Sequence, residues 1–118
     1  MTVFGDGEQA RDYMYIDDAI NAYLLVQEKG EYGEEYNAGT GVPITINNLV
    51  EFMEDHILPH SGHIHVEPRP GEVNLLCADA TKLRLLGWEP ERVTFEEKLM
   101  RFINSYKKAL KQGYGKNT

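Results

Sequence analysis

The sequence predicts an α/β fold that is rich in helix in its second half and has an incomplete sheet of few, short strands. Several stretches place apolar residues at helical spacing, between residues that start and stop helices. The strand candidates are separated by these helices, an order that favours parallel strands with cover on both faces. The predicted strands are too few and too short to form a closed sheet. We therefore expect a piece of a larger fold, or one completed by a partner.

Residues 1–30 predict two extended segments, a turn between them and a helix. The apolar run 2–4 leads into the glycine-rich turn 5–7. Residues 11–16 alternate enough to form a short strand. Asp17 and Asp18 supply an N-cap and an acidic first turn, and Gly30 ends the helix that follows.

The middle of the chain predicts a strand, a helix and a second strand. Residues 34–38 are expected to form a strand that ends at the Gly-Thr-Gly of 39–41. A helix with one apolar face begins at Thr45 and ends at Pro59. Residues 63–66 alternate like a short strand, and the two prolines and the glycine of 68–71 require irregular backbone.

The last third predicts two helices. Asp79 caps a short helix that closes at Gly87. Thr94 and Glu97 form a capping box, and the helix that follows carries a clean apolar stripe. We expect one domain over residues 1–112 and a frayed tail over residues 113–118.

Composition places the chain among soluble globular proteins, with 42% hydrophobic and 26% charged residues. The net charge of -7 disfavours nucleic acid and anionic membranes as partners. No apolar run approaches the ~20 residues of a membrane span, and residues 1–6 resemble no signal or transit peptide, so a cytoplasmic location is expected. Cys77 is the only cysteine, which excludes an internal disulfide, and its apolar neighbours predict a buried side chain.

Two arginines are the candidate ligand-binding residues. Arg11 follows the glycine turn, and Arg69 lies in the proline-bounded loop. A guanidinium on a rigid loop presents a planar fork of donors that matches phosphate oxygens, and two converging forks would hold a diphosphate. The alternative is that each arginine forms an ion pair with a neighbouring carboxylate, Asp12 or Glu72.

Four segments, in order along nearly the whole chain, resemble one enzyme family. The segments are TVFGDGEQARDYMYIDD at 2–18, EYNAGTG at 35–41, RPGEV at 69–73 with DATK at 79–82 and LGWEP at 86–90, and the capping box at Thr94. They resemble the extended short-chain dehydrogenase/reductases, which are NAD(P)-dependent nucleotide-sugar epimerases and dehydratases with a Rossmann-type fold. The chain is similar to the carboxy-terminal, substrate-binding part of that family.

The resemblance implies which residues bind the substrate. In that family the arginines that match Arg11 and Arg69 reach the diphosphate of the nucleotide-sugar. The residue that matches Glu72 lies beside the ribose or the phosphates in several members. Asn37 is a further candidate, with the alternative that it only joins strand and loop by side-chain hydrogen bonds. The implied ligand is a UDP-, dTDP- or GDP-hexose. The matching segments resemble subfamilies that bind different nucleotide bases, so the base stays open. The choice between 4-epimerase and 4,6-dehydratase also stays open.

No catalytic or cofactor-binding residue is predicted in this chain. The family's cofactor loop is G-x-G-x-x-G, whereas the Gly-Thr-Gly of 39–41 has Ile44 at the position of the third glycine. The family's catalytic tyrosine has a lysine four residues later, and none of the 7 tyrosines here has one. For the whole enzyme the resemblance implies NAD or NADP and hydride transfer at sugar C4. This chain alone is expected to bind no cofactor and to be inactive.

Two further questions concern metals and partners. His56, His60, His63 and His65 lie close in sequence and raise the alternative of a zinc site, but Pro59 breaks the helix that would align the first two, so no metal is predicted. The unpaired edges of the strand at 34–38 predict self-association, a domain swap or pairing with an amino-terminal Rossmann chain. The alternatives are an independent small binding module, a split-gene subunit, or a remnant that binds no ligand.

Overall fold

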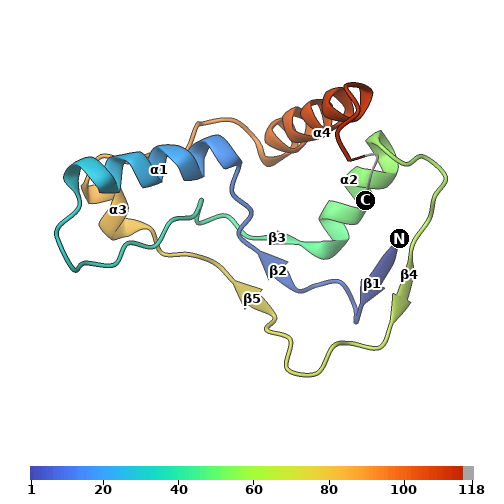
Figure 1. The fold of residues 1–118 in the computed structure, drawn as a ribbon. Helices are drawn as coiled ribbons and strands as arrows, with labels where there is room; N and C mark the ends of the chain where they lie inside the picture. The colour runs from blue at the N-terminus through green and yellow to red at the C-terminus, as the bar shows by residue number, and fades with distance from the viewer. Residues whose placement is uncertain (116–118) are drawn as a thin grey trace.

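The structure is a computed structural model, and it describes residues 1–115. Four helices and five short strands make up the regular structure of this part of the chain (Figure 1). The helices are α1 (Ile16–Lys29), α2 (Ile46–His56), α3 (Thr81–Leu85) and α4 (Phe95–Lys111). The strands are β1 (Thr2–Phe4), β2 (Ala10–Arg11), β3 (Ile44–Thr45), β4 (Ile64–Val66) and β5 (Leu75–Leu76). The mixed α/β class and the incomplete sheet predicted from the sequence are confirmed.

The strands form two small sheets. β1 pairs with β4 in parallel, with Val3 opposite His65. In the second sheet β2 lies between β3, which is antiparallel to it, and β5, which is parallel to it. Arg11 is therefore held between Ile44 on one side and Leu76 on the other. This three-stranded sheet fixes the backbone of the first candidate binding residue.

Helices α2 and α4 begin where the sequence places their caps, whereas α1 begins at Ile16, before the predicted cap at Asp17, and its N-cap residue is Tyr15. The side chain of Thr45 accepts a hydrogen bond from the amide of Asn48 at the start of α2, at 3.1 Å. The side chain of Thr94 accepts one from the amide of Glu97 at the start of α4, also at 3.1 Å. Each hydroxyl satisfies an amide that has no partner within its helix, so polar residues at these two positions define the helix starts.

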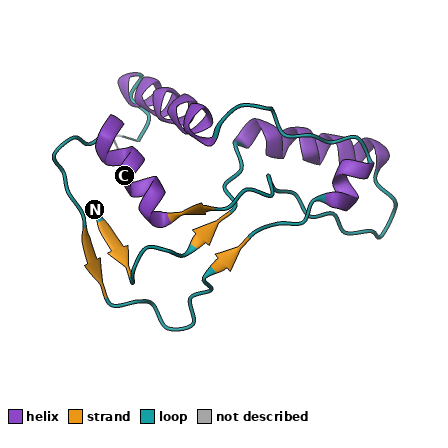
Figure 2. Ribbon diagram, turned by 180° about the vertical axis from the view of Figure 1, so that it is seen from behind, coloured by secondary structure: helices purple, strands orange, loops and turns teal. Residues whose placement is uncertain are grey.

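The main core lies between α1 and α3, which Figures 1 and 2 place side by side at one end of the molecule. Its buried members are Ala22, Ala80, Leu83 and Trp88. The Trp88 indole donates a hydrogen bond of 3.1 Å to the carbonyl of Asp18, so its polar edge is satisfied inside the core.

A buried ion pair joins α1 to α4. Lys98 Nζ lies 2.6 Å from Asp18 Oδ2, and the amide of Glu91 donates to Asp18 Oδ1 at 2.8 Å. Both side chains of the pair are nearly excluded from solvent. Asp18 therefore does more than interact favourably with the helix dipole. Its carboxylate also holds α1 to the chain segment that leads into α4.

Two expectations for extended segments were wrong or only partly right, and two short strands were not predicted. Residues 34–38 form no strand, because their backbone has no pairing partner within residues 1–115. The strand predicted at 11–16 is confined to β2, and helix α1 already begins at Ile16. β3 and β5 were missed, since strands of two residues are too short to show a periodic pattern.

Two local predictions also need correction. Cys77 is exposed rather than buried, because the short β5 strand before it leaves Leu75 and Leu76 more than half exposed. Asp79 does not cap α3 as predicted: the N-cap residue is Ala80, and the Asp79 carboxylate instead accepts hydrogen bonds from the amide and hydroxyl of Thr81. The predicted tail at 113–118 lies partly outside the described residues.

Helix α2 ends at His56 rather than at Pro59, with Ile57 as its C-cap residue. The difference of a few residues reflects the restriction that proline imposes on the residues before it. Within residues 1–115, no helix combines the length and the apolar character needed to cross a membrane.

Candidate functional site

Arg11 lies at the end of β2, and its guanidinium reaches Glu72 of the loop 69–72. One terminal nitrogen donates to the carbonyl of Ala10 at 2.8 Å, and the other lies 3.5 Å from Glu72 Oε1. About a quarter of each side chain in this ion pair is exposed, 24% for Arg11 and 26% for Glu72. The structure thus brings two of the four predicted site residues together, in an ion pair between distant segments rather than between an arginine and the carboxylate next to it in sequence.

Arg69 and Glu72 are the first and last residues of one tight turn. Pro70 and Gly71 occupy its central positions, Gly71 has a φ of 75°, and the amide of Glu72 donates to the carbonyl of Arg69 at 3.3 Å. Proline followed by a residue with positive φ is typical of a type II turn, and glycine takes that conformation without steric cost. The Pro-Gly pair therefore places both charged side chains on one short segment.

The Arg69 guanidinium lies over the ring of Phe4 in β1, 4.0 Å from the ring centroid. Pro68, next in the chain, packs against the turn at Gly5, where an added Cβ would come within 3.3 Å of the proline side chain. Within residues 1–115 no carboxylate forms an ion pair with Arg69. Stacking of this kind orients a guanidinium and leaves its donors in the ring plane free for an anion.

Asn37, the fourth predicted site residue, is not joined to the other three. It lies in the exposed segment that follows α1, and no hydrogen bond or ion pair connects it with Arg11, Arg69 or Glu72. The alternative role, joining strand and loop by side-chain hydrogen bonds, also has no counterpart among the described residues. Its predicted role in binding stays a prediction.

Asp12 was missed as an organising residue. Its Oδ1 accepts from the amide of Thr40 at 3.0 Å and from the Thr40 hydroxyl at 2.5 Å. Its Oδ2 accepts from the amides of Gly41 at 2.9 Å and Ala78 at 3.3 Å. One carboxylate thereby ties the residue after Arg11 to two loops that are distant in sequence.

The hydrogen bonds to Asp12 favour its charged form. Burial opposes ionisation, but the Thr40 hydroxyl and the amides of Gly41, Thr40 and Ala78 outweigh it and hold the pKa of Asp12 below its ordinary value. Gly39 is required beside this carboxylate, because an added Cβ would lie 2.6 Å from Asp12 Oδ2 and 2.4 Å from the Ala78 side chain.

The loop 39–41 is the part of the chain closest in sequence to a dinucleotide-binding loop. Its amides at Thr40 and Gly41 already donate to the Asp12 carboxylate. A pyrophosphate needs such amides free and arranged at a helix N-terminus. The residues of this loop therefore do not fit the phosphates of NAD. Beside the loop lies a shallow hollow of about 260 Å³, which Arg84 and residues 78–81 also line.

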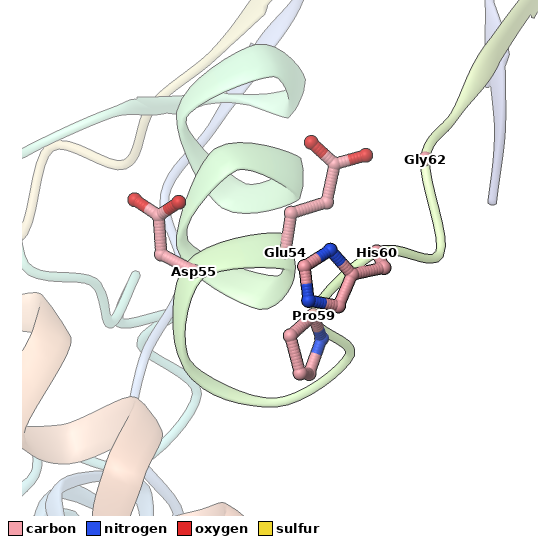
Figure 3. A pocket seen from close by; sticks show the side chains of 5 residues that line it. All are labelled: Glu54, Asp55, Pro59, His60 and Gly62. Atoms are coloured by element: carbon pink, nitrogen blue, oxygen red, sulfur yellow. The ribbon is translucent and has the colours of Figure 1, made fainter.

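A second, larger hollow of about 640 Å³ lies at the carboxyl end of α2 (Figure 3). Glu54 and Asp55 come from the last turns of the helix, and Pro59, His60 and Gly62 from the loop after it. Within residues 1–115, no group of three or more His, Cys, Asp and Glu side chains is placed to hold a metal ion.

The four histidines differ in their surroundings. His63 Nδ1 lies 2.7 Å from Glu54 Oε1, whereas the Nδ1 atoms of His56 and His65 lie against the carbonyls of Phe52 and Gly5. The rings of His63 and His65 meet edge to face, with centroids 5.3 Å apart. Each of these three imidazoles thus has a local partner: two of the partners, Phe52 and Glu54, lie in α2, and the third, Gly5, lies in the turn after β1.

Comparison with known proteins places this arrangement in a family. The family model described as GDP-mannose 4,6 dehydratase matches residues 1–102. The low-salt glycan biosynthesis protein Agl12 of Haloferax volcanii is 35% identical over 107 residues, which cover 90% of this chain and 34% of that protein.

Solved structures agree with this match. UDP-glucose 4-epimerase from Thermotoga maritima, determined with UDP-glucose, is 39% identical and has a TM-score of 0.84 over 93% of this chain and 35% of that one. A dTDP-glucose 4,6-dehydratase from Streptomyces venezuelae, determined with NAD, is 29% identical with a TM-score of 0.81, over 92% of this chain and 34% of that one.

The chain spans about a third of the length of these relatives. Within that third the match extends over both sheets, the loop 69–72 and the first part of α4. The chain therefore belongs to the GDP-mannose 4,6 dehydratase family, among the NAD-dependent nucleotide-sugar epimerases and dehydratases of the extended short-chain dehydrogenase/reductase class.

Proposed function

We propose that this chain is the nucleotide-sugar-binding part of a 4-epimerase or 4,6-dehydratase, and that Arg11 and Arg69 bind the diphosphate of the substrate. The observation that carries the proposal is the 69–72 turn. It places Arg69 three residues from Glu72, and Glu72 pairs with Arg11. Two guanidinium groups from different elements are thereby linked through one short segment.

The chemistry of the two arginines suits a diphosphate. Each guanidinium remains charged when partly dehydrated and can donate two parallel hydrogen bonds to phosphate oxygens. Arg11 has a rigid backbone within the three-stranded sheet, and Arg69 is oriented by Phe4. Held side chains lose less conformational entropy on binding than free ones. Glu72 would keep Arg11 extended toward the loop and offer an acceptor to a ribose hydroxyl.

The catalytic chemistry, in this proposal, belongs to a part of the enzyme outside this chain. The loop 39–41 does not fit the phosphates of a dinucleotide, since its amides are bound to Asp12. None of the 7 tyrosines has a lysine four residues later. Substrate binding and orientation are therefore the steps we assign to these residues, and we expect no turnover by the chain alone.

Calorimetric titration with UDP, dTDP and GDP tests the proposal, using the unmodified chain and the variants Arg11→Ala and Arg69→Ala. Charge-assisted hydrogen bonds are worth about 1.5–3 kcal/mol each, so dissociation constants in the millimolar to high-micromolar range are expected. Both variants should weaken binding by about ten-fold or more, because each removes at least 1.4 kcal/mol of phosphate contact.

Arg92→Ala is the matched control, because Arg92 is a strongly exposed arginine whose ion pair within residues 1–115 is with nearby Glu89. It should bind like the unmodified chain, and the nucleotide with the tightest binding would name the preferred base. Equal affinity in the unmodified chain and both site variants would refute the role of the two arginines. Absence of heat with all three nucleotides would show that this chain does not bind them without further residues.

A further inference from the structure

Two histidines lie close together at the start of β4. His63 immediately precedes the strand, and His65 lies within it. Residues two positions apart along a strand point to the same face. The two rings meet edge to face with centroids 5.3 Å apart, and both residues are exposed. A tetrahedral metal ion bound by one nitrogen of each imidazole, at about 2.0–2.1 Å, would hold the two ring centroids about 5 Å apart. The observed spacing matches that arrangement.

The hydrogen bonds of the two rings leave one nitrogen of each able to bind a metal ion. His65 Nδ1 lies 2.7 Å from the carbonyl of Gly5, and His63 Nδ1 lies 2.7 Å from Glu54 Oε1. A carbonyl and an ionised carboxylate only accept hydrogen bonds, so each Nδ1 carries a proton. In a neutral imidazole the lone pair is then on Nε2, the atom that can bind a metal ion. Within residues 1–115 neither Nε2 forms a hydrogen bond.

The acceptors of the two rings are of the kind found behind metal-binding histidines. Such a histidine usually donates its other N–H to a carboxylate or a backbone carbonyl, which fixes the tautomer and the orientation of the ring. Here one ring has a carboxylate and the other a carbonyl. Both acceptors lie on other elements, Glu54 in α2 and Gly5 in the turn after β1. The fold therefore orients both imidazoles without a metal ion, which lowers the entropy cost of binding one.

We propose that His63 and His65 form a binding site for one divalent transition-metal ion, with Cu²⁺ preferred over Zn²⁺. The sequence argument against a metal concerns His56 and His60, which Pro59 separates, and it does not apply to this pair. Imidazole nitrogen suits Cu²⁺, Ni²⁺ and Zn²⁺, and Cu²⁺ binds most tightly among them. Within residues 1–115 no group of three His, Cys, Asp or Glu side chains is placed to hold an ion, so the chain supplies two ligands and water supplies the others. The site is independent of the proposed function.

Calorimetric titration of the metal-free chain with Cu²⁺ and Zn²⁺ salts tests the site, in a Cys77→Ser background that removes the exposed thiol. One ion should bind per chain. The dissociation constant for Zn²⁺ should be on the order of 10 μM, because two protein ligands bind less tightly than the four of a structural zinc site. Cu²⁺ should bind about ten-fold more tightly. Mg²⁺ should not bind, because it prefers oxygen ligands.

His63→Gln and His65→Gln remove the metal ligands while retaining their hydrogen bonds, because a glutamine amide can still donate but has no imidazole lone pair. Each should weaken binding of either metal by about ten-fold or more. His56→Gln is the matched control. His56 Nδ1 also lies against a carbonyl, that of Phe52, but its ring stacks on Phe52 instead of a second histidine. This variant should bind within about two-fold of the unmodified chain.

A second pair of variants tests the support of the site. Glu54→Ala should weaken binding by about ten-fold, the usual effect of losing the acceptor behind a metal-binding histidine. Asp55→Ala removes the neighbouring carboxylate, which lines the same hollow (Figure 3), and should change affinity by less than about three-fold, since salt screens an exposed charge. No saturable binding of Cu²⁺ or Zn²⁺, or binding that His63→Gln and His65→Gln both retain, would overturn the metal site. Equal losses in Glu54→Ala and Asp55→Ala would refute the orienting role of Glu54 in it.

Discussion

At the scale of single residues, Asp12 connects segments that are distant in the sequence. Its two oxygens hold the amides of Thr40, Gly41 and Ala78 and the hydroxyl of Thr40. These partners lie 28, 29 and 66 positions away in sequence. Since Asp12 directly follows Arg11, the same carboxylate fixes the backbone on which the candidate phosphate-binding side chain stands.

Asp12→Asn is predicted to destabilise the chain by about 2 kcal/mol at neutral pH, because hydrogen bonds to a charged acceptor are worth about 1.5–3 kcal/mol and the new amide cannot accept at its nitrogen. Urea unfolding followed by circular dichroism measures the change. Asp79→Asn is the control: its carboxylate is exposed, and its hydrogen bonds within the described part of the chain come from Thr81, two residues away. A loss at Asp12 no larger than at Asp79 would contradict the proposed role.

The acid dependence of stability gives a second readout of the same carboxylate. The pKa of Asp12 lies below its ordinary value of 3.8, so the folded state favours the charged form. Its contribution is therefore present above the unfolded pKa and is lost as the pH falls through the lower, folded pKa. The unmodified chain should lose stability over this acidic window more steeply than Asp12→Asn, so their difference should shrink as the pH falls.

Some of the site was predictable from sequence, and some was not. The Pro-Gly sequence of the loop 69–72 fixes a local turn, so the relation between Arg69 and Glu72 follows from neighbouring residues. The partners of Asp12 are brought together only by the packing of two distant loops. No local pattern marks an aspartate of this kind, although a glycine at position 39 is consistent with the close approach of the Asp12 carboxylate.

At the scale of elements, helices were predictable where a polar side chain caps the first turn. Thr45 and Thr94 cap α2 and α4 through their hydroxyls, as the sequence indicates. The strands depend on partners instead. Residues 34–38 have a strand-like sequence but no pairing segment within residues 1–115, whereas β3 and β5 have unremarkable sequences and pair with β2. A strand forms only where two segments pair, so the sequence of one segment alone predicts it poorly.

Thr94→Ala is predicted to lower the free energy of unfolding by about 1 kcal/mol, the usual cost of losing an N-cap hydroxyl. The amide of Glu97 would lose the acceptor that it has at 3.1 Å. Loss of helical circular dichroism on heating measures the effect. Thr94→Ser keeps the hydroxyl and should retain most of the stability; a loss equal to that of Thr94→Ala would assign the effect to the methyl group rather than to the cap.

At the scale of the whole molecule, the chain is elongated, with principal extents of 48 × 39 × 28 Å. Its core of Ala22, Ala80, Leu83 and Trp88 lies at the end formed by α1 and α3. The β1–β4 pair lies at the other end, as Figure 1 shows, and buries Val3. Cooperative unfolding requires shared burial between parts of a structure, and an expanded chain whose core cluster lies at one end provides little of it.

We therefore predict that the two ends open independently. Leu83→Ala removes a fully buried side chain, at a cost of about 2–5 kcal/mol, and should speed hydrogen exchange of amides at the α3 end, such as that of Arg84. The amides of Gly5 and Ile64, which bond across β1 and β4, should exchange at their original rates. Val3→Ala should give the mirror result. Hydrogen exchange read by mass spectrometry measures both. If Leu83→Ala accelerated exchange equally at both ends, the chain would unfold as one unit, and its two ends would share more stability than their separation implies.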